Sequence, residues 1–401
     1  MAWNHKARVV ALAVAIQSVP GTFTTPTSAD IIAVAPPTNG EDIVSVDDPT
    51  ATGSIWQAPR VFLGKTANVG AVAPLRGPGG ATPPALNAWP LGRVLQAAGY
   101  AEVRSAAAVT GTAAAGGTTT SIVLAAGASA VDDFYNGMPI QHATIGTAGT
   151  IKGNSLILDY NGTSKAATLG ETMGSAVTTG TYTIPPNLCY QLGTLSTAPP
   201  LLSVTVWRDK KRYDYRDVRI SQLTFDMPVA NEQNQVYPSI EFQLKGLVAA
   251  VTDATAPALT AAQLSTIAPY RNGKFCLDKV ALGHQSTKFG ISAEVAGASN
   301  AAATEGQDGY EIMSGQRSFE MDLNQMAVTD FDIETRVNNQ TTVSSISLWG
   351  MGAGNRFGSA VPEIVLDPLN NPGDRNGFVN LTGNAAFVGV DKSHTFTVWW
   401  D

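Results

Sequence analysis

The residues that could carry out chemistry show no catalytic spacing. The four histidines lack the short spacings typical of metal ligands. They are His5, His142, His284 and His394. Gly64-Lys65-Thr66 is similar to the end of a phosphate-binding loop, but Pro59 stands where the first glycine of that loop is required. The Gly-x-Ser-x-Gly motif of serine hydrolases is missing from the sequence. We therefore expect no catalytic residue, no cofactor and no metal ion.

Carboxylates form the one chemical pattern in the chain. Glu320 and Asp322 alternate with apolar residues, as do Asp332 and Glu334, and Glu241 does the same near the centre of the sequence. Alternation with period two is typical of strands with one buried and one exposed face. The sequence therefore predicts an acidic surface made by strand faces. An ordinary solvated face is the simplest interpretation of this pattern.

The composition favours an all-β protein. Charged residues make up 14% of the 401-residue chain, whereas it contains 39 Gly and 23 Pro. Helix formers such as Glu and Lys are scarce, which favours strands and turns. The formal net charge of −7 argues against a protein that grips nucleic acid by its phosphates. Cys189 and Cys276 could form a disulfide or remain two buried thiols, and we favour the thiols.

The rest of the chain is organised around Leu201 to Val248. Leu202, Val204 and Val206 alternate with polar or aromatic residues, and Asp209-Lys210-Lys211 is a polar turn. The apolar phase then changes near Ser221-Gln222, which predicts a β-bulge. Ile240, Phe242 and Leu244 are expected to face the core, with Glu241, Gln243 and Lys245 on the opposite side. The stretch therefore predicts three or four antiparallel strands with one hydrated face.

This stretch resembles the centre of the tail tube proteins of long-tailed bacteriophages of the siphophage type. The similarity lies in a strand, a charged turn with an aromatic return, a long strand, and a strand that ends Phe242-Gln-Leu-Lys-Gly246. The resemblance implies an all-β fold, a tail-tube-type β-sandwich or barrel. It also implies one short flanking helix and a long loop arm.

The N-terminal third fits this resemblance. Arg8 to Gln17 is expected to be a strand, although its basic and apolar residues are superficially similar to a signal peptide. A short strand is expected at Ile31 to Ala35. Pro36 to Pro90 is rich in Gly and Pro and is expected to be the loop arm. Leu91 to Ala98 predicts the flanking helix, with Pro90 at its start and Gly99 at its end. No apolar run is long enough to span a membrane as a helix.

A segment of different composition interrupts the predicted tube domain. Residues 106–186 are rich in Ala, Gly, Thr and Ser, and the dipeptide Asn161-Gly162 is a strong hairpin signal. The flexible flank at Ser105 to Gly117 favours an insertion at a loop tip. We therefore expect an inserted β-rich accessory domain at 106–186, facing outward. The tube domain would then consist of 1–105 and 187–401.

The resemblance implies a structural virion protein that is not an enzyme. Its copies would form stacked rings, of six subunits by family analogy, that build the tail tube and conduct DNA into the host. Partners would be other copies and the tape measure, terminator and distal tail proteins. DNA would pass without specific binding. The protein would be made in the host bacterial cytoplasm and located in the virion tail. The acidic residues Glu241, Glu320, Asp322, Asp332 and Glu334 would face the lumen and repel DNA over a short range.

Several other functions remain open from the residues alone. One is another virion protein, such as a tail terminator or a capsid decoration protein. Another is a secreted β-sandwich adhesin or glycan-binding protein, for which aromatic clusters on an exposed face would be expected. The last is a β-rich hydrolase, which requires a convergent pair of carboxylates.

Overall fold

The protein is built mainly from β-strands. The computed structural model describes residues 10–47, 60–80, 82–193, 198–232, 235–260, 263–303, 306–324, 326–368, 373–375, 378–387 and 394–400. Strands account for 54% and helices for 5%. Most strands belong to one large antiparallel sheet, and six others form a smaller, curled sheet. The all-β prediction is thus confirmed. No helix in the described parts is long and apolar enough to cross a membrane.

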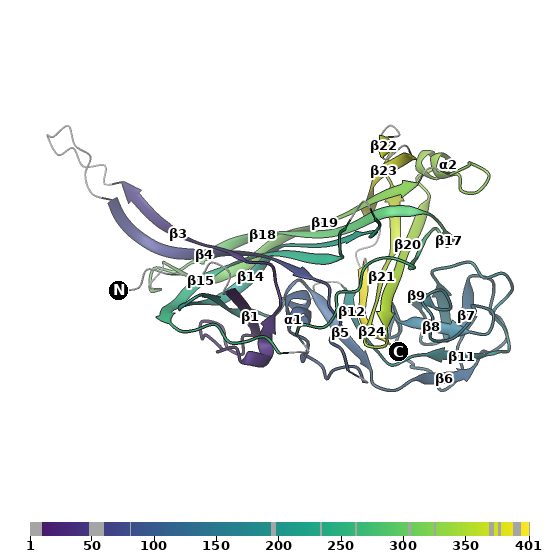
Figure 1. The fold of residues 1–401 in the computed structure, drawn as a ribbon, viewed down its shortest axis with the longest axis horizontal. Helices are drawn as coiled ribbons and strands as arrows, with labels where there is room; N and C mark the ends of the chain where they lie inside the picture. Colours follow the sequence, from purple (N-terminus) through teal and green to yellow (C-terminus); the bar gives the residue numbers. More distant parts are fainter. Residues whose placement is uncertain are drawn as a thin grey trace.

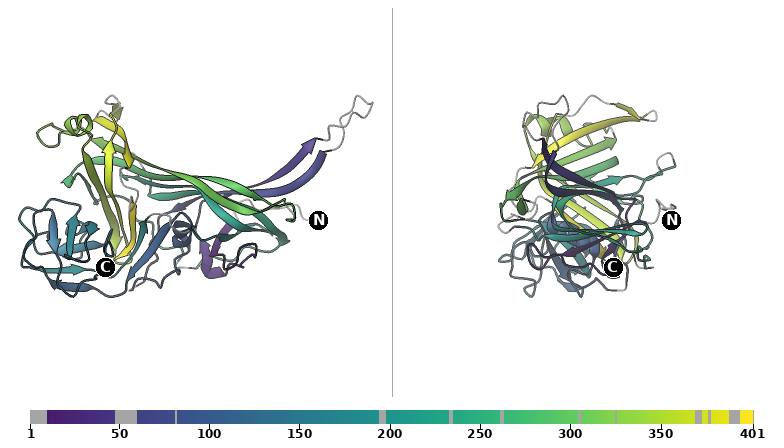
Figure 2. Two further views of the ribbon diagram at one scale, coloured as in Figure 1. Left: turned by 180° about the vertical axis from the view of Figure 1, so that it is seen from behind. Right: turned by 90° about the vertical axis from the view of Figure 1, so that its left-hand side faces the viewer.

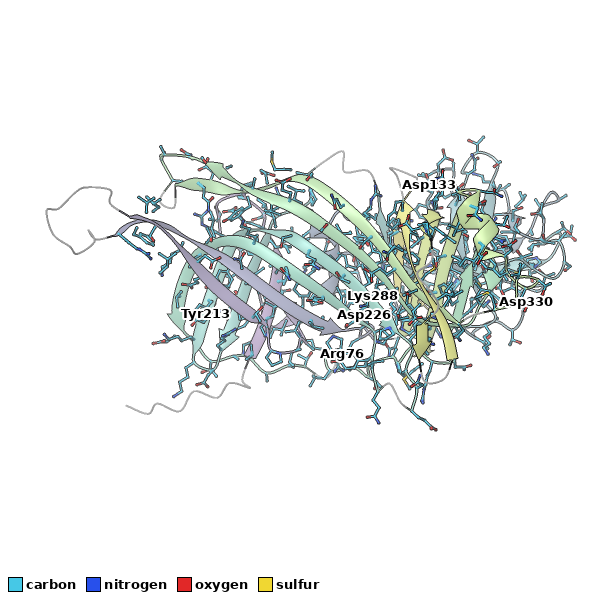
Figure 3. The ribbon with its side chains drawn as sticks, turned by 90° about the horizontal axis from the view of Figure 1, so that it is seen from above. Arg76, Asp133, Tyr213, Asp226, Lys288 and Asp330 are labelled. Carbon is cyan, nitrogen blue, oxygen red and sulfur yellow. The ribbon has the colours of Figure 1, made fainter. Side chains whose placement is uncertain are left out.

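The longest strands lie side by side as a curved layer, which we call the roof layer (Figures 1 and 3). Their pairing order is β3–β4–β15–β14–β18–β19–β23, with β22 beside β23. Their bounds are β3 Thr38–Asp47, β4 Arg60–Pro74, β14 Lys211–Pro228, β15 Ser239–Asp253, β18 His284–Ser299, β19 Gln307–Asn324, β22 Gly373–Arg375 and β23 Phe378–Phe387.

The remaining strands of the large sheet and one helix close the core below the roof layer and, with β20, β21 and β24, across one end of it (Figure 1; the reverse and end views are in Figure 2). The strands are β1 Val10–Ile16, β2 Ile31–Ile32, β5 Tyr100–Ser105, β12 Asn187–Leu192, β13 Leu202–Arg208, β16 Lys274–Leu277, β17 Val280–Ala281, β20 Thr342–Gly352, β21 Asn355–Leu366 and β24 His394–Trp400. A 3₁₀ helix spans Ser28–Asp30. The predicted strands at the N-terminus and at 31–35 are present, in shorter form.

The flanking helix is also confirmed, as α1 Pro90–Ala97. Val94 and Leu95 are fully buried on its inner face. Pro90 occupies the first turn, where its missing N–H costs no hydrogen bond. Gly99 follows the helix with a φ of 101°, a conformation that glycine adopts without steric cost. α1 therefore begins and ends where its sequence signals predict.

The central stretch folds as three consecutive antiparallel strands, β13, β14 and β15, as predicted. Asp209 turns the chain between β13 and β14 with a φ of 55°. The pairing of β14 with β15 shifts between Ile220 and Gln222, so the predicted bulge is confirmed. One part of the prediction is wrong, because Leu202 to Trp207 is buried on both faces. The side that was expected to be hydrated is covered by the chain segment around Thr24, whose N–H donates to the Ser203 hydroxyl, and by apolar residues at 254–259, which pack against Trp207.

The predicted loop arm is wrong in its secondary structure. Most of Pro36 to Pro90 forms the long hairpin β3–β4, which extends beyond the rest of the molecule (Figure 1). Glycines at 40, 64 and 70 lie inside these strands, and the gain from pairing and packing outweighs their weak strand preference. Within this segment the sequence also favours a short strand piece at Ser54 to Trp56, which lies outside the described residues.

The six-stranded sheet lies within the segment predicted as an insert. Its strands are β6 Val109–Thr112, β7 Ser121–Val123, β8 Pro139–His142, β9 Ser155–Tyr160, β10 Ala166–Leu169 and β11 Thr181–Ile184. Asn161 turns the chain from β9 to β10, and its side chain accepts hydrogen bonds from the N–H groups of Thr163 and Ser164. The flank 105–117 contains β6, so it is more ordered than predicted. The domain limits and the outward orientation stay predictions.

The smaller sheet packs firmly against the large one. Leu156 and Leu158 of β9 form a buried cluster with residues of β16, β20 and β21. These residues are Cys276, Ile346, Leu348 and Ala360. The Lys274 ammonium donates to the Asn154 carbonyl at 2.9 Å and pairs with the Glu171 carboxylate. The Thr397 hydroxyl donates to the Gly137 carbonyl at 2.7 Å. Removal of the smaller sheet would therefore uncover apolar surface and leave buried polar groups without partners.

A chain that lacks residues 106–186, with its ends rejoined by a short Gly/Ser linker, is expected to have low solubility and to self-associate. Cys276 is fully buried in the intact protein and should react with an aromatic disulfide reagent only in the shortened chain. A Cys276→Ser version of the shortened chain is the control for the labelled site. A soluble shortened chain in which Cys276 does not react would mean that the large sheet covers this surface without the smaller sheet.

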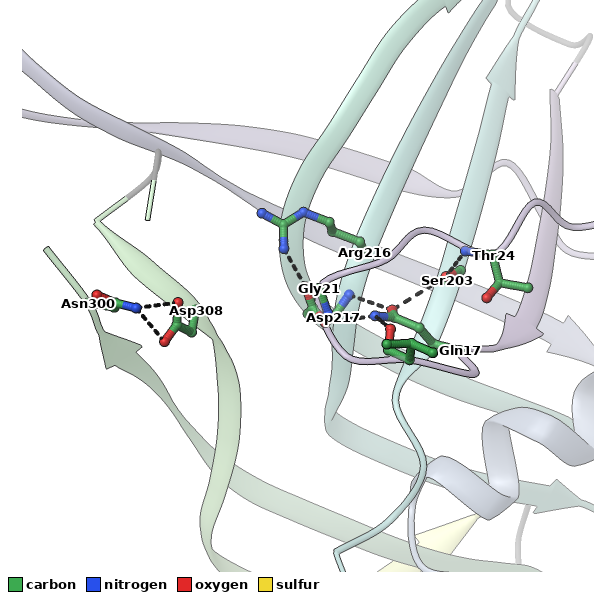
Figure 4. A network of polar contacts seen from close by, with 9 residues as sticks. Gln17, Gly21, Thr24, Ser203, Arg216, Asp217, Asn300 and Asp308 are labelled. Atoms are coloured by element: carbon green, nitrogen blue, oxygen red, sulfur yellow. Dashed lines mark hydrogen bonds and ion pairs between the residues drawn. The ribbon is translucent and has the colours of Figure 1, made fainter. Parts of the chain in front are cut away.

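A buried polar network fixes the bend of β14 (Figure 4). Asp217 has a φ of 50° and lies in a second bulge of β14, between Arg216 and Arg219. Its carboxylate accepts hydrogen bonds from the Gln17 amide at 2.8 Å and the Gly21 N–H at 2.7 Å. The Arg216 guanidinium pairs with it at 2.6 Å. The bulge lets the two halves of β14 pair with different strands, β13 first and β18 later.

Replacing Asp217 with Ala should lower the free energy of unfolding by about 3 kcal/mol, because the Gln17 amide, the Gly21 N–H and the Arg216 guanidinium would lose the carboxylate they bond. Ala is also strained at positive φ, whereas Asn tolerates it. Asp217→Asn keeps an oxygen for the two N–H donors and should cost about 1 kcal/mol. Denaturant unfolding of the three proteins measures both values. Equal losses for Ala and Asn would show that the charge of Asp217, rather than its backbone conformation and hydrogen bonds, dominates.

Candidate functional site: the polar face of the roof layer

The two faces of the roof layer differ in chemistry. In β15, Ile240, Phe242 and Leu244 are buried, whereas Glu241 and Gln243 are exposed. This confirms the predicted faces of the strand. The neighbouring strands follow the same alternation, which produces one continuous outward surface that we call the polar face. Its residues include Thr224, Asp226, Glu241, Gln243, Lys288, Ser292, Ser318, Glu320, Thr382 and Asn384.

Strand register aligns these side chains in rows across the layer. Phe225 pairs with Phe289, and Phe289 pairs with Phe319, so one row of aromatic rings points into the core. The next residue on each strand points the opposite way, because the side-chain period is two. Asp226 therefore lies opposite Lys288, and Lys288 opposite Glu320, on the polar face. The layer thus combines an apolar underside with a hydrated upper side.

Most of the polar face carries small uncharged side chains. Ser, Thr, Asn, Gln and Gly occupy the majority of its positions on β14, β15, β18, β19 and β23. Such groups bind water well and offer a polyanion neither a guanidinium fork nor an apolar cleft. The face is therefore suited to passing a charged polymer rather than to holding it.

Charged residues are sparse on this face. Asp226 and Lys288 lie close together near its middle (Figure 3). Partial burial raises the pKa of the Asp226 carboxyl, the Lys288 ammonium lowers it, and the Glu320 carboxylate raises it. Asp226 is half-buried, while Lys288 and Glu320 are exposed. The register places Lys288 directly between Asp226 and Glu320, so the three groups are close enough to act on one another across the strands.

Three of the predicted acidic residues lie on the roof layer. Glu241 and Glu320 are exposed on the polar face, on β15 and β19. Asp322 is two positions beyond Glu320 and has the same orientation in the strand, but only 7% of its surface is exposed. Asp322 is therefore a poorer candidate for contact with a passing molecule than Glu320.

The strand predicted around Asp332 and Glu334 is wrong, whereas their position in a lumen stays a prediction. This segment forms helix α2, Ile333–Asn338. Asp332 is the N-cap and accepts hydrogen bonds from the Thr335 N–H at 2.9 Å and the Thr335 hydroxyl at 2.6 Å. These two bonds lower the pKa of the Asp332 carboxyl. Glu334 lies in the first turn, where a negative charge favours the helix.

The sequence interpretation missed two residues of the polar face, Asp226 and Lys288. A signal for Asp226 was present, because it lies between the core residues Phe225 and Met227. Lys288 similarly lies between the buried residues Thr287 and Phe289. What the sequence lacks is the register that places these two residues opposite each other.

The β3–β4 hairpin is the second surface of functional interest. Its strands carry exposed apolar side chains, with Ile43 exposed by 63%, Phe62 by 58% and Val46 by 51%. Ile43 and Val46 lie on opposite sides of β3, since neighbouring side chains alternate. Surface apolar groups on both sides of a projecting hairpin are typical of a segment that is covered by a partner.

The buried reactive groups serve the core. His394 has no exposed surface, and burial lowers its pKa to about 3. Tyr100 and Ser359 hydrogen-bond its two ring nitrogens at 2.6 and 2.9 Å, so a serine–histidine pair exists but is sealed from substrates. Cys189 and Cys276 are free buried thiols, as favoured above. Among the residues that the structure describes, no group of three or more His, Cys, Asp or Glu side chains could hold a metal ion.

No family model matches the chain, and no curated protein is significantly similar to it in sequence. The resemblance to tail tube proteins therefore stays a prediction.

Proposed function

We propose that this protein is the subunit of a tube, and specifically the tail tube protein of a long-tailed bacteriophage. The polar face of the roof layer lines the channel, and copies of the chain surround it in stacked rings. The tube conducts DNA during ejection and performs no chemical reaction. In this role the partners are other copies and the proteins at the two ends and in the lumen of the tail.

The observation that carries this proposal is the two-sided roof layer with open lateral edges. Within the described residues, β3 pairs only with β4, and Gln307 to Ser318 of β19 pair only with β18. An open edge favours association with another strand. A curved sheet with an apolar underside, a polar upper face and two open edges can be repeated around an axis. The polar faces would then form one closed wall.

The hairpin arm supports stacking of the rings. β3–β4 projects beyond the roof layer (Figure 1), and apolar groups are exposed on both of its sides. Burying these groups against a neighbouring copy would contribute about 25 cal/mol for each Å² of apolar surface, which offsets part of the entropy cost of association. The β3–β4 hairpin thus takes the place of the loop arm that the sequence predicted.

The electrostatics of the polar face suit the passage of DNA. Glu241, Glu320 and Asp226 supply negative charge, and Lys288 partly offsets it. A weakly negative wall repels phosphates over about 8 Å at physiological salt, the range set by ionic screening. DNA would therefore slide without forming lasting ion pairs with the wall.

Negative-stain electron microscopy of the purified protein tests the proposal directly. Hollow tubes or rings of regular diameter are expected, and light scattering should detect the corresponding oligomers. A capsid decoration or tail terminator protein would give isolated rings or small oligomers that never lengthen into tubes. A protein that stays monomeric at high concentration and binds glycans would contradict the proposal and favour an adhesin.

A further inference from the structure

We propose that Asp226, Lys288 and Glu320 form a charge-balancing row in which Lys288 keeps the polar face neutral enough for copies of the chain to assemble around it. The inference rests on the proposed function, because it assigns a task to one residue within the proposed channel wall. In this proposal the charge of Lys288 favours association of the copies, and Lys288 does not contact DNA.

The row is set by strand register. Asp226 of β14 pairs with Lys288 of β18, and Lys288 pairs with Glu320 of β19. Directly opposed residues in antiparallel strands have Cβ atoms about 5 Å apart, close enough for charges to interact. Lys288 is therefore flanked by a carboxylate on each side. Uncharged Ser239 and Asn384 continue the row, on β15 and β23.

The surrounding charges make Lys288 important. Glu241 lies on β15 one row away, opposite Thr224, and Asp322 lies on β19 two residues beyond Glu320. Lys245 of β15 lies four residues beyond Glu241 and places its ammonium over the Tyr310 ring at 5.1 Å. Lys288 is thus the cation that interrupts the carboxylates in the middle of the polar face.

The physical consequence concerns association. With Lys288 present, the row has a formal charge of −1, since two carboxylates surround one ammonium. Replacement of Lys288 by Glu changes that charge to −3 in every copy. When polar faces are brought together around an axis, this repulsion is multiplied by the number of copies and opposes closure. Salt at about 1 M shortens the screening length to about 3 Å and should remove the effect.

A charge series at position 288 tests the row. Lys288→Arg should behave like the native protein, Lys288→Gln should assemble less well, and Lys288→Glu should show at least a tenfold loss of sedimentable assemblies at low salt. Added salt should restore assembly. The double variant Lys288→Gln with Glu320→Gln returns the row to −1 and should recover native assembly. Lys152→Glu is the matched control, because it changes the net charge equally at an exposed position in the turn that precedes β9.

A second readout keeps the test independent of tube formation. In dilute, unassembled subunits, Lys288→Glu should lower the thermal midpoint at low salt more than Lys152→Glu does, because it places three like charges in adjacent strands. If native chains never form rings or tubes, the proposed function fails, and the thermal comparison alone decides whether the row exists. If tubes form but the 288 variants match Lys152→Glu in both readouts, the row has no such task. An impaired Lys288→Gln that Glu320→Gln does not rescue would assign the effect to the packing of the lysine stem, and would also overturn the inference.

Discussion

Replacing Phe242 with Asp is expected to abolish folding of the chain. Phe242 has no exposed surface and lies in the main hydrophobic cluster, where it pairs with Leu223 of β14 and Ala71 of β4. Loss of a buried phenylalanine costs about 3 to 5 kcal/mol, and a buried unpaired carboxylate costs several kcal/mol more. Together these penalties equal the whole stability of a typical domain, about 5 to 15 kcal/mol. Circular dichroism and proteolysis of the purified variant measure the outcome.

The matched control is the adjacent residue. Glu241→Gln changes an exposed side chain on the polar face and should leave both the fold and the assembled particles intact. Folded, soluble Phe242→Asp together with an unfolded Glu241→Gln would mean that the two faces of β15 are reversed. That result would remove the physical basis of the proposed channel wall.

Reversing charge on the polar face should convert the channel from a passage into a DNA-binding site. Glu241→Lys with Glu320→Lys alters two exposed residues, so the subunit should fold as before. Tubes with this change should retain double-stranded DNA. Retention should fall on the order of 10³-fold between roughly 50 and 200 mM salt, because bound phosphates release counterions. Co-sedimentation of labelled DNA with the tubes provides the measurement.

Acidic residues outside the polar face provide the control for this experiment. Asp330 and Glu334 are exposed and lie beside and on α2, so their replacement by Lys changes the net charge of the chain by the same amount. This variant should not retain DNA in the channel. Equal retention by the two variants would indicate binding to the outside of the particle and would count against the lumen assignment.

Labelling gives an independent view of the same face. The native thiols of Cys189 and Cys276 are buried, and burial raises the pKa of each to about 12, so both should be unreactive. A cysteine introduced at Glu320 should react rapidly with a bulky thiol reagent in free subunits and slowly in long closed tubes. Comparable rates in the two states would place Glu320 on the exterior.

The sequence by itself determined most of the strands and the orientation of their side chains. Ile240, Phe242 and Leu244 alternate so regularly with polar residues that only one face of β15 can be buried at low cost. The sequence predicts strands at Ser155 to Tyr160, Ala166 to Leu169 and Thr181 to Ile184, and β9, β10 and β11 begin and end at these residues, since a hairpin signal and polar segments bound them. The helix α1 was likewise fixed by local signals, Pro90 and Gly99.

Local patterns failed where two periodicities fit the same residues. Phe331, Ile333 and Thr335 alternate as in a strand, yet Asp332 caps a helical turn through Thr335, and the two hydrogen bonds it accepts favour α2. The hairpin arm was missed for the opposite reason. Its Gly-rich strands have weak intrinsic preference, and β4 is stabilised by pairing with β15, a strand far away in the sequence.

Tertiary structure alone decided which residues meet across the sheet. Asp226, Lys288 and Glu320 are each readable as exposed strand positions, but nothing in the sequence relates their registers. Register depends on the bulges of β14 and on the core that β14, β18 and β19 share, and both are set by contacts between distant segments. Strand alternation therefore predicted a polar face for this protein, whereas the row of charges on that face exists only because long-range packing aligns the three strands.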